Sequence, residues 1–335
     1  MDQREEKNIK KLYAITPSDW GGVCDFNKEL LQNFLTDGAE LSPVTRRVYE
    51  SNLKIWFVWV KDNLGNKKQI EIKPLEFKRF QNWMIARDCS SSDISNKRAA
   101  ISSLNNYLEI YFADEYPLFR NFINKSIARP PKVAKNAKEP LNKNEFEHLL
   151  SELNNKKAFQ KIAYCEFTFD TGCRRAESRQ LLKCVIETEP VIKEKDGKRI
   201  VFYLTNDIRC KGRGSEGKVR KFAFSEKTMA ALKKWLEVRG SDDCKFMFVH
   251  KVGGVIKQVT ETTFNAWAAG LFTRIVGRRV YPHLLRSSRA TQLVIEEGKD
   301  ITIAQKLLGH ESSVTTEGYV IRDDSEDLDE LYLED

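Results

Sequence analysis

The first third of the chain places its hydrophobic residues at the spacing of amphipathic helices. Ser42-Pro43 is typical of an N-cap followed by a proline in the first helical turn. Three successive segments, opening near Ser42, Pro74 and Ser92, then repeat apolar residues on one helical face. These faces consist of Tyr49, Leu53, Trp56 and Val60, then Phe77, Phe80 and Met84, then Ile101, Leu104, Leu108 and Tyr111. The pattern predicts a small helical domain over residues 39–124.

Two segments of different character flank this domain. Residues 1–38 form a polar N-terminal extension, and the sequence leaves their role open. Residues 125–140 hold three prolines, five cations and one acid, and they offer little to bury. We therefore predict an extended basic linker there. It could be an ordinary hinge or a strap lying on a negatively charged partner.

The second half of the chain mixes helical and strand patterns. Asn142, with Glu145 three residues later, resembles a capping box that opens a helix. Helical spacing continues to about Asp170, and another helix is expected after Thr171-Gly172. Strand-forming residues and turn signals fill residues 184–224, and helical patterns return from Glu226 to the end. We predict a mainly α protein with a small antiparallel β-sheet, with a mixed α/β domain at 141–321 and an acidic tail at 322–335.

The charge is unevenly distributed. The formal net charge is +8, yet the final fourteen residues carry eight acidic residues and one arginine, so the remaining chain is at +15. A chain with this much positive charge favours an anionic partner, most commonly DNA or RNA, although the charge alone does not identify the partner. The seven cysteines form no CxxC pair, and we expect reduced thiols in a cytoplasmic protein. The sequence has no signal peptide, membrane span, P-loop or metal-ligand spacing, so we expect no membrane association, metal or cofactor.

Four short segments of residues 141–321 carry groups suited to phosphate chemistry. They are Thr171-Gly172-Cys173-Arg174-Arg175-Ala176-Glu177, then Cys210-Lys211-Gly212, then His283-Leu284-Leu285-Arg286, then Leu308-Gly309-His310 with Tyr319 nine residues beyond the histidine. In this order they resemble the motifs of the tyrosine recombinases, the phage-integrase family. One fragment would be weak support, whereas four in the right order are specific. The resemblance covers residues 141–321 by motif and 40–124 by architecture only.

The resemblance implies a helical core-binding domain, a tyrosine-recombinase catalytic domain and a defined set of catalytic residues. Two guanidiniums can bind the nonbridging oxygens of a DNA phosphate bidentately while keeping their charge. A phenol needs nearby positive charge and a base, and a leaving 5′-hydroxyl needs a proton. The implied catalytic residues are Tyr319 as nucleophile, Arg174 and Arg286 on the phosphate, His283 with Lys211 as possible bases, Lys211 as general acid, His310 on the transition state and Glu177 as orienting group.

Each assignment has a simpler alternative. Arg174 could only be an ion-pair partner of Glu177 at a helix start, and the two motif histidines could be buried structural residues. Lys218 and Lys221 share the hairpin with Lys211. Tyr281 and Tyr332 compete with Tyr319, but neither follows a Leu-Gly-His at the required interval. The sequence departs from the family at Ser287, where a histidine or lysine often follows the arginine.

The expected partner is double-stranded DNA carrying recombination sites. We expect Arg46, Arg47, Lys97 and Arg98 to lie on exposed faces of the helical domain. From there, and from the linker, the phosphate backbone would be contacted by Arg46, Arg47, Lys97, Arg98, Arg129, Lys132 and Lys135. A Cre-like or Xer-like two-domain recombinase would act as a homotetramer on two sites through a Holliday junction, with room for accessory DNA-bending factors. In the tail, Leu328, Leu331 and Leu333 could dock on a neighbouring subunit, or the tail could simply be solvated.

The predicted activity is site-specific recombination, for integration or excision, through a 3′-phosphotyrosyl intermediate. Because that ester keeps the energy of the broken phosphodiester, rejoining needs neither ATP nor a metal. Two alternatives remain at this point. One is a type IB topoisomerase, which uses the same chemistry without exchanging partners, and the other is a catalytically silent DNA-binding protein on the same fold.

Overall fold

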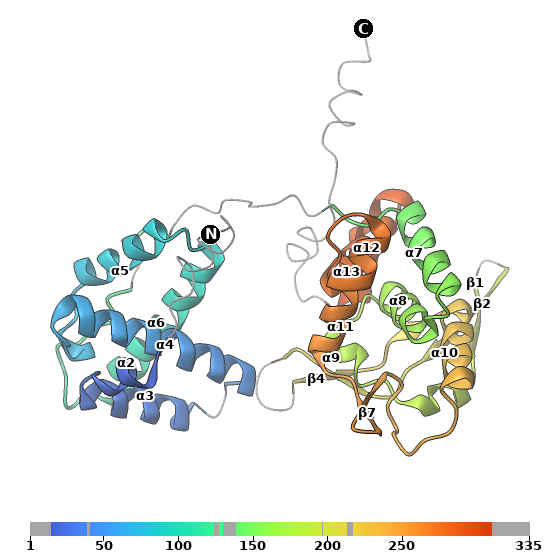
Figure 1. Ribbon diagram of the computed structural model, residues 1–335. Helices are drawn as coiled ribbons and strands as arrows, with labels where there is room; N and C mark the ends of the chain where they lie inside the picture. The colour runs from blue at the N-terminus through green and yellow to red at the C-terminus, as the bar shows by residue number, and fades with distance from the viewer. Residues whose placement is uncertain are drawn as a thin grey trace, which may run out of the picture. The chain divides into compact units, whose positions relative to one another are not determined.

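A computed structural model describes residues 15–38, 41–123, 127–129, 139–195, 197–212 and 217–309. The chain divides into two compact units, residues 1–136 with 213–216 and residues 137–212 with 217–335 (Figure 1). Each unit has its own hydrophobic core. The division after residue 136 falls inside the segment predicted as a linker.

The described part of the first unit is helical. Its helices are α2 (Pro17–Gly21), α3 (Asp25–Asp37), α4 (Pro43–Leu64), the 3₁₀ turn η1 (Gln69–Glu71), α5 (Pro74–Ala86) and α6 (Ser91–Tyr111). Helix α4 begins as predicted, because the Ser42 hydroxyl accepts a hydrogen bond of 3.1 Å from the Thr45 N–H and Pro43 occupies the first turn. It ends at Gly65, which adopts the left-handed conformation with φ 65°.

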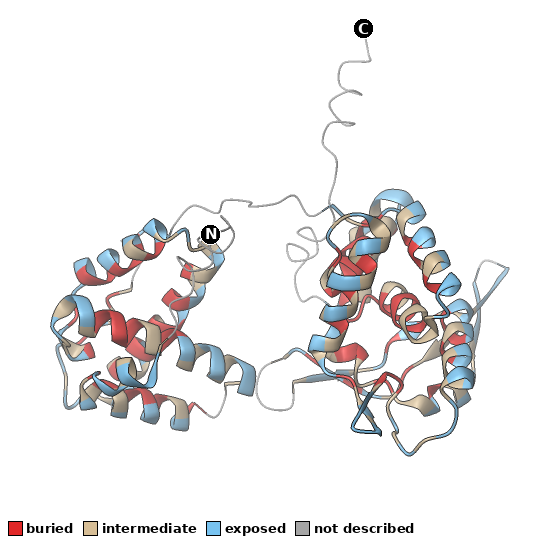
Figure 2. Cartoon of the chain, in the orientation of Figure 1, coloured by how far each residue is buried: buried red, intermediate tan, exposed pale blue. Residues whose placement is uncertain are grey.

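Aromatic side chains form the centre of the first core. Trp56 is fully buried, stacks on Trp59 with ring centroids 5.7 Å apart, and meets Phe80 edge-on at 4.9 Å. Its indole N–H donates to the Gln69 side chain at 2.8 Å, so the buried polar atom is satisfied. Val23, Leu30, Leu31 and Phe34, from the extension whose role was open, belong to the same core. The red inner faces of these helices in Figure 2 mark this packing.

Helices surround α8 in the second unit. The elements are α7 (Lys143–Asn155), α8 (Phe159–Thr171), α9 (Arg175–Ser178), η2 (Lys183–Glu187), α10 (Glu226–Arg239), α11 (Glu261–Trp267), η3 (Ala268–Phe272), α12 (Thr273–Val276), α13 (Pro282–Thr291), η4 (Gln292–Glu296) and α14 (Ile301–Leu308). Helix α8 contacts α7, α10 and α13, and its Tyr164 and Phe167 are fully buried (Figure 1). The predicted Asn142–Glu145 capping box is present at the start of α7. These contacts make α8 the central helix of this core.

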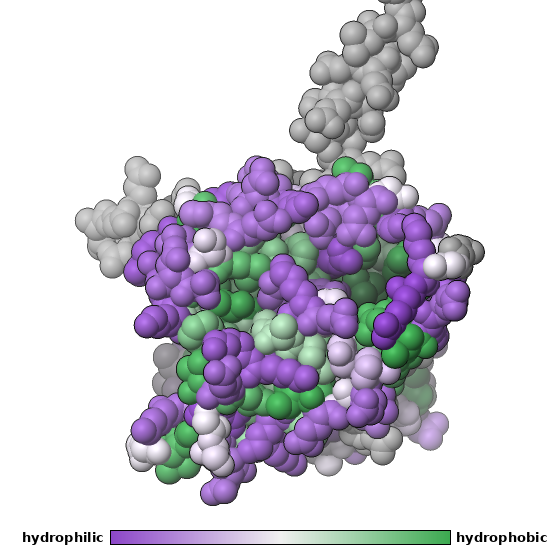
Figure 3. Space-filling view, turned by 90° about the vertical axis from the view of Figure 1, so that its right-hand side faces the viewer, coloured by the Kyte–Doolittle hydropathy of each residue, from purple (hydrophilic) through white to green (hydrophobic). Residues whose placement is uncertain are grey.

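Small antiparallel sheets complete the second unit. The strands are β1 (Val191–Lys195), β2 (Lys198–Leu204), β3 (Ile208–Cys210), β4 (Lys218–Arg220), β5 (Ala223–Phe224), β6 (Val249–Val252) and β7 (Val255–Gln258). They pair as β1-β2-β5, β3-β4 and β6-β7. The predicted class, mainly α with a small antiparallel sheet, is confirmed. On the side carrying α10 and the β1–β2 hairpin, hydrophilic residues surround hydrophobic side chains that show between them (Figure 3).

The prediction of helix alone after Glu226 was wrong for residues 249–258. Strands β6 and β7 pair there, with Val252 opposite Val255 across a turn at Gly253 and Gly254. Both glycines have positive φ, 56° and 82°, a conformation that residues with a Cβ rarely adopt. The hairpin is therefore specified by its two-glycine turn, a signal that the helical pattern around it concealed.

Candidate active site

The first motif forms a sharp connection between two helices. Helix α8 ends at Thr171, and Gly172 follows in the left-handed conformation with φ 60°. A Cβ on Gly172 would lie 2.8 Å from Leu308 Cδ2, so the close approach of the two motifs requires glycine at this position. Arg174 is then the extended N-cap residue of the one-turn helix α9. The helix expected after Thr171-Gly172 is present, and it is only four residues long.

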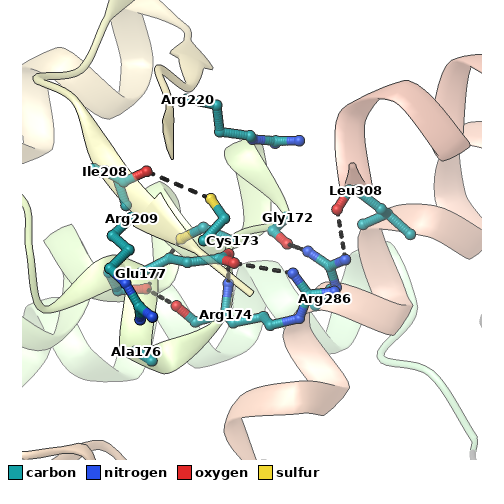
Figure 4. Close-up of polar contacts among 12 residues, drawn as sticks. Gly172, Cys173, Arg174, Ala176, Glu177, Ile208, Arg209, Arg220, Arg286 and Leu308 are labelled. Atoms are coloured by element: carbon teal, nitrogen blue, oxygen red, sulfur yellow. Dashed lines mark hydrogen bonds and ion pairs between the residues drawn. The ribbon is translucent and has the colours of Figure 1, made fainter. Parts of the chain in front are cut away.

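Glu177 fixes the position of Arg174. One carboxylate oxygen accepts a hydrogen bond of 2.6 Å from the Arg174 backbone N–H, and the other accepts one of 2.9 Å from Arg174 Nη1 (Figure 4). The Glu177 side chain is 2% exposed, whereas that of Arg174 is 29% exposed. The ion pair between Arg174 and Glu177, which the sequence offered as an alternative to a catalytic role for Arg174, therefore exists. Because the guanidinium also reaches the surface, it can bind a further anion.

Arg286 is a fully buried cation. It lies on α13, and its guanidinium donates hydrogen bonds to the backbone carbonyl oxygens of Gly172 and Leu308, the second at 2.7 Å (Figure 4). Burying a charge is costly unless hydrogen bonds compensate for the lost hydration. The two carbonyls provide such compensation, and Arg286 thereby joins the ends of α8 and α14.

Lys211 lies at the end of β3, in the hairpin that β3 and β4 form. Cys210 pairs with Lys218 across the hairpin, and Lys211 follows directly as an exposed residue. A Cβ on Gly212 would lie 2.7 Å from the Lys218 backbone nitrogen, so only glycine fits this close approach of the two strand ends. Lys211 and Lys218 line a pocket of about 270 Å³, and Lys221 is not among its described lining residues.

Arg174 lies between two pockets. The 270 Å³ pocket contains Arg174, Lys211, Lys218 and Arg220, and Glu177 is the one acidic residue among its described lining. A second pocket of about 450 Å³ is lined by Arg174 together with Tyr281, His283 and Arg286 from α13 and its N-cap. The two pockets thus bring together five of the predicted residues, namely Arg174, Glu177, Lys211, His283 and Arg286. Two concave sites rich in cations suit an anionic substrate such as a phosphodiester.

The end of α14, which precedes the segment predicted to carry the nucleophile, lies beside these pockets. Helix α14 ends at Leu308, and Gly309 is left-handed with φ 65°. Leu308 and Gly309 both line the 270 Å³ pocket. The predicted residues His310 and Tyr319, as well as Lys132 and Lys135 of the linker, lie outside the described residues. Their roles remain predictions.

Two buried cysteines adjoin the cationic residues. Burial raises the pKa of Cys173 to about 11, and it raises the pKa of Cys210 to about 11, where the Glu177 carboxylate adds to the effect. Both thiols are therefore neutral at physiological pH, and neither is a nucleophile there. Cys173 Sγ lies 3.0 Å from the Ser178 hydroxyl, a contact that helps to anchor α9.

The cations expected to contact DNA from the helical unit differ in exposure. Arg47 and Arg129 are exposed, and Arg46 is half-buried with Nη2 donating to the Gly38 carbonyl at 3.1 Å. The prediction that Lys97 and Arg98 lie on an exposed face was wrong, because they are only 7% and 6% exposed.

Both buried cations have partners inside the unit. Lys97 pairs with Asp93 one turn earlier at 2.6 Å. Arg98 Nη1 donates to the Gln81 side chain at 2.5 Å, and its Nη2 donates to the Ile127 carbonyl at 2.9 Å. Arg98 therefore holds α5, α6 and the segment around Ile127 together.

Sequence reasoning missed Arg220, which lines the smaller pocket and donates a hydrogen bond of 2.6 Å from Nη2 to the Leu307 carbonyl. Its only local signal is strand alternation, which places Arg220 on the same face of β4 as Lys218. Within the described ranges, no cluster of three histidine, cysteine, aspartate or glutamate residues could hold a metal ion. No helix in those ranges is long and apolar enough to cross a membrane.

Comparison with known proteins gives consistent matches. The model of the phage integrase family matches residues 139–326. The SPbeta prophage-derived recombinase-like protein YomM of Bacillus subtilis is 31% identical over 328 residues, which cover 96% of each chain. A tyrosine recombinase of Thermosipho africanus is 23% identical over 303 residues, covering 90% of this chain and 96% of its own.

Solved structures share the fold at low sequence identity. The Tn1549 transposon integrase in complex with transposon right end DNA has a TM-score of 0.64 and 19% identity, and the match covers 92% of this chain and 99% of that one. A lambda integrase tetramer bound to a Holliday junction has a TM-score of 0.58 and 15% identity, and the match covers 95% and 80%. At these identities the likeness establishes the architecture alone.

Proposed function

Because the chain belongs to the phage integrase family and is a site-specific tyrosine recombinase, we propose that Tyr319 cuts DNA by attacking a backbone phosphate held between Arg174 and Arg286. The observation that carries this proposal is the position of Gly309. It lines the same pocket as Arg174 and Lys211, ten residues before the tyrosine. Neither alternative, a type IB topoisomerase or a silent DNA-binding protein, is favoured by the family matches.

The proposed step exchanges one phosphate ester for another. The Tyr319 oxygen forms a bond to phosphorus and gives its proton to a base, for which His283 is our candidate. The bond from phosphorus to the 5′-oxygen breaks, and Lys211 donates a proton to that oxygen. The product is a 3′-phosphotyrosyl ester with a free 5′-hydroxyl. Attack by the 5′-hydroxyl of a partner strand reverses the step and rejoins the DNA.

Negative charge builds on the phosphate in the transition state, and fixed cations stabilise it most when they are already in place. Glu177 holds Arg174 through two hydrogen bonds, and backbone carbonyls hold Arg286. We assign His310 as a further hydrogen-bond donor to the phosphate. This preorganisation spares the reaction the cost of orienting long side chains during catalysis.

We further propose that residues 39–124 form the core-binding domain, that residues 125–140 lie on DNA as a cationic strap, and that residues 141–321 catalyse. Double-stranded recombination sites would be the substrate, acted on by a homotetramer on two sites inside the cytoplasm, with room for accessory DNA-bending factors. The lambda integrase tetramer on a Holliday junction, which shares this fold, supports that assembly.

The decisive experiment is Tyr319→Phe. The variant should bind its DNA site as the wild-type chain does, because only the nucleophilic oxygen is lost, and it should form no detergent-resistant protein–DNA complex. Tyr332→Phe is the matched control, since it removes the same oxygen outside the motif, and it should form the complex at the wild-type rate. A covalent complex formed by Tyr319→Phe would refute the assignment.

A further inference from the structure

Two arginines from distant parts of the second unit bind the end of α14. Arg286 donates to the carbonyl of Leu308 at 2.7 Å, and Arg220 donates to the carbonyl of Leu307 at 2.6 Å. The last carbonyls of a helix lack partners within the helix and carry partial negative charge, so cations are favourable there. Arg286 belongs to the proposed phosphate site. The proposed chemistry of that site does not use Arg220.

Arg220 comes from β4, the second strand of the hairpin that carries Lys211. Its guanidinium carbon lies 4.0 Å from the centroid of the Phe222 ring, a distance typical of a cation–π contact. The ring supports one side of the guanidinium while Nη2 reaches the α14 carbonyl. Figure 4 shows the side chain extending from its strand toward the helix that ends at Leu308.

Gly309 makes this approach possible. A Cβ at Gly309 would collide with Nη1 of Arg220, and the residue has a φ of 65°, which favours glycine independently. The guanidinium therefore packs directly against the backbone where the chain leaves α14 toward His310 and Tyr319. Gly309 is the second residue of the Leu-Gly-His motif, so this packing gives the glycine a physical role.

We propose that Arg220 is a positioning residue that couples the general-acid hairpin to the nucleophile segment. This inference rests on the proposed function, in which Lys211 and Tyr319 act on the two ester bonds of one phosphorus. Their relative placement must be accurate, because a displacement of about 1 Å can cost about 10²-fold in rate. Arg220 holds both parts, since it sits on the hairpin of Lys211 and binds the chain end that leads to Tyr319.

The first test compares Arg220→Ala with Arg220→Lys and with Arg199→Ala, which removes an exposed arginine from β2. Arg220→Ala should slow formation of the covalent complex by about 10- to 100-fold. DNA binding should change by less than about twofold. Arg220→Lys should recover part of the rate because it restores a cation at the helix end. Arg199→Ala should match the wild-type chain.

Modified substrates separate this role from acid catalysis and from phosphate binding. A 5′-bridging sulfur leaves without protonation, so it should restore much of the rate of Lys211→Ala but only part of the rate of Arg220→Ala, in which the nucleophile segment is displaced as well. A methylphosphonate removes the phosphate charge, so it would restore Arg220→Ala only if Arg220 bound the phosphate directly. Full rescue of Arg220→Ala by the sulfur substrate, or rescue by the methylphosphonate, would overturn the proposal.

A double-mutant cycle tests the contact itself. Gly309→Ala should slow cleavage in the wild-type background, where the new methyl group meets Arg220, and should cost less in the Arg220→Ala background. Additive effects would mean that the two residues do not act through one contact. If Arg220→Ala fails to fold, the cycle is run with Arg220→Lys, whose amine is smaller than the guanidinium.

The Tyr319→Phe experiment is run in parallel to keep the two proposals separate. If Tyr319→Phe still cleaves, the proposed function fails. If Tyr319→Phe is inactive while Arg220→Ala cleaves at the wild-type rate, only the positioning role is refuted.

Discussion

Arg286 donates a hydrogen bond of 2.7 Å to the carbonyl oxygen of Leu308, and the same guanidinium donates to the carbonyl of Gly172. One buried cation thus joins three of the sequence motifs. Two of these motifs are far apart in the chain, since Gly172 and Arg286 are separated by more than a hundred residues. The first and last motifs also touch directly, because Gly172 has room for no side chain beside Leu308. These contacts place the end of α14, from which the chain continues toward Tyr319, beside the arginines that we propose to bind the phosphate.

The division of roles between Lys211 and Arg174 can be measured. Lys211→Ala should slow cleavage by the ~10²–10⁴-fold typical of a missing general acid, with little change in DNA binding. A 5′-bridging sulfur should restore much of that rate. Arg174→Ala should not be restored, because its removal leaves the phosphate charge unbalanced whichever atom departs. Rescue of Lys218→Ala instead would move the general acid along the hairpin.

The linker should contribute to DNA affinity through counterion release. Replacing Lys132, Lys135 and Lys138 together with alanine should flatten the slope of log affinity against log salt by at most about three units, at ~0.9 for each phosphate that is no longer neutralised. Binding titrations over a range of salt concentrations measure this slope. A slope equal to that of the wild-type chain would mean that none of these lysines binds the DNA backbone.

The ion pair between Glu145 and Arg278 should make stability depend on pH. Arg278 binds both carboxylate oxygens at 2.7 Å and lowers the pKa of Glu145. The pKa of Glu145 is therefore lower in the folded state than its unfolded value of about 4.3. The ion pair stabilises the fold above that pH, and this stabilisation is lost as the pH falls through the folded pKa. Glu145→Gln should therefore cost about 1–2 kcal/mol near neutrality.

Thermal unfolding across a pH series checks the prediction. At pH 7 the unfolding midpoint of Glu145→Gln should lie below that of the wild-type chain by about 2–4 °C for each kcal/mol of stability lost. Below about pH 4 the difference between the two midpoints should shrink. A constant difference at all pH values would show that the charge of Glu145 is not the cause.

The cysteines should differ in reactivity. Because burial raises the pKa of Cys173 and Cys210 to about 11, only about one thiol in a thousand is ionised at pH 8. Cys184 is exposed. Brief alkylation of the folded protein, mapped by mass spectrometry, should label Cys184 first, and denaturation should make all seven reactive. Equal labelling of Cys173 and Cys184 before unfolding would contradict the burial argument.

Local patterns were predictable from the sequence because their partners lie within one helical turn. The Ser42 cap, the Asn142–Glu145 capping box and the pairing of Arg174 with Glu177 each join residues three positions apart. The motif spacing similarly predicted residues that lie close together, because five of the seven proposed catalytic residues are described and line two adjoining pockets. Their catalytic roles stay predictions.

Interactions between distant segments were not predictable. Arg98 looked solvent-exposed on a helical face, but Ile127, from a segment expected to be linker, is buried and accepts its hydrogen bond. Arg220 meets Leu307 across 87 residues, and no local pattern indicates such a partner. Helical periodicity reports which face of a helix is apolar, whereas burial of a cation depends on what folds over it.

The crowding between Gly172 and Leu308 has a consequence for gene shuffling. A chimera that joins residues before the β3–β4 hairpin to the corresponding C-terminal part of a relative would combine a glycine turn from one parent with a leucine from the other. The gap between them was shaped within a single chain, and a slightly larger or differently placed side chain would push the turn off the helix end. Productive crossovers should therefore keep Gly172, Arg220, Arg286 and Leu308 from one parent, so that this part of the enzyme is inherited as a unit.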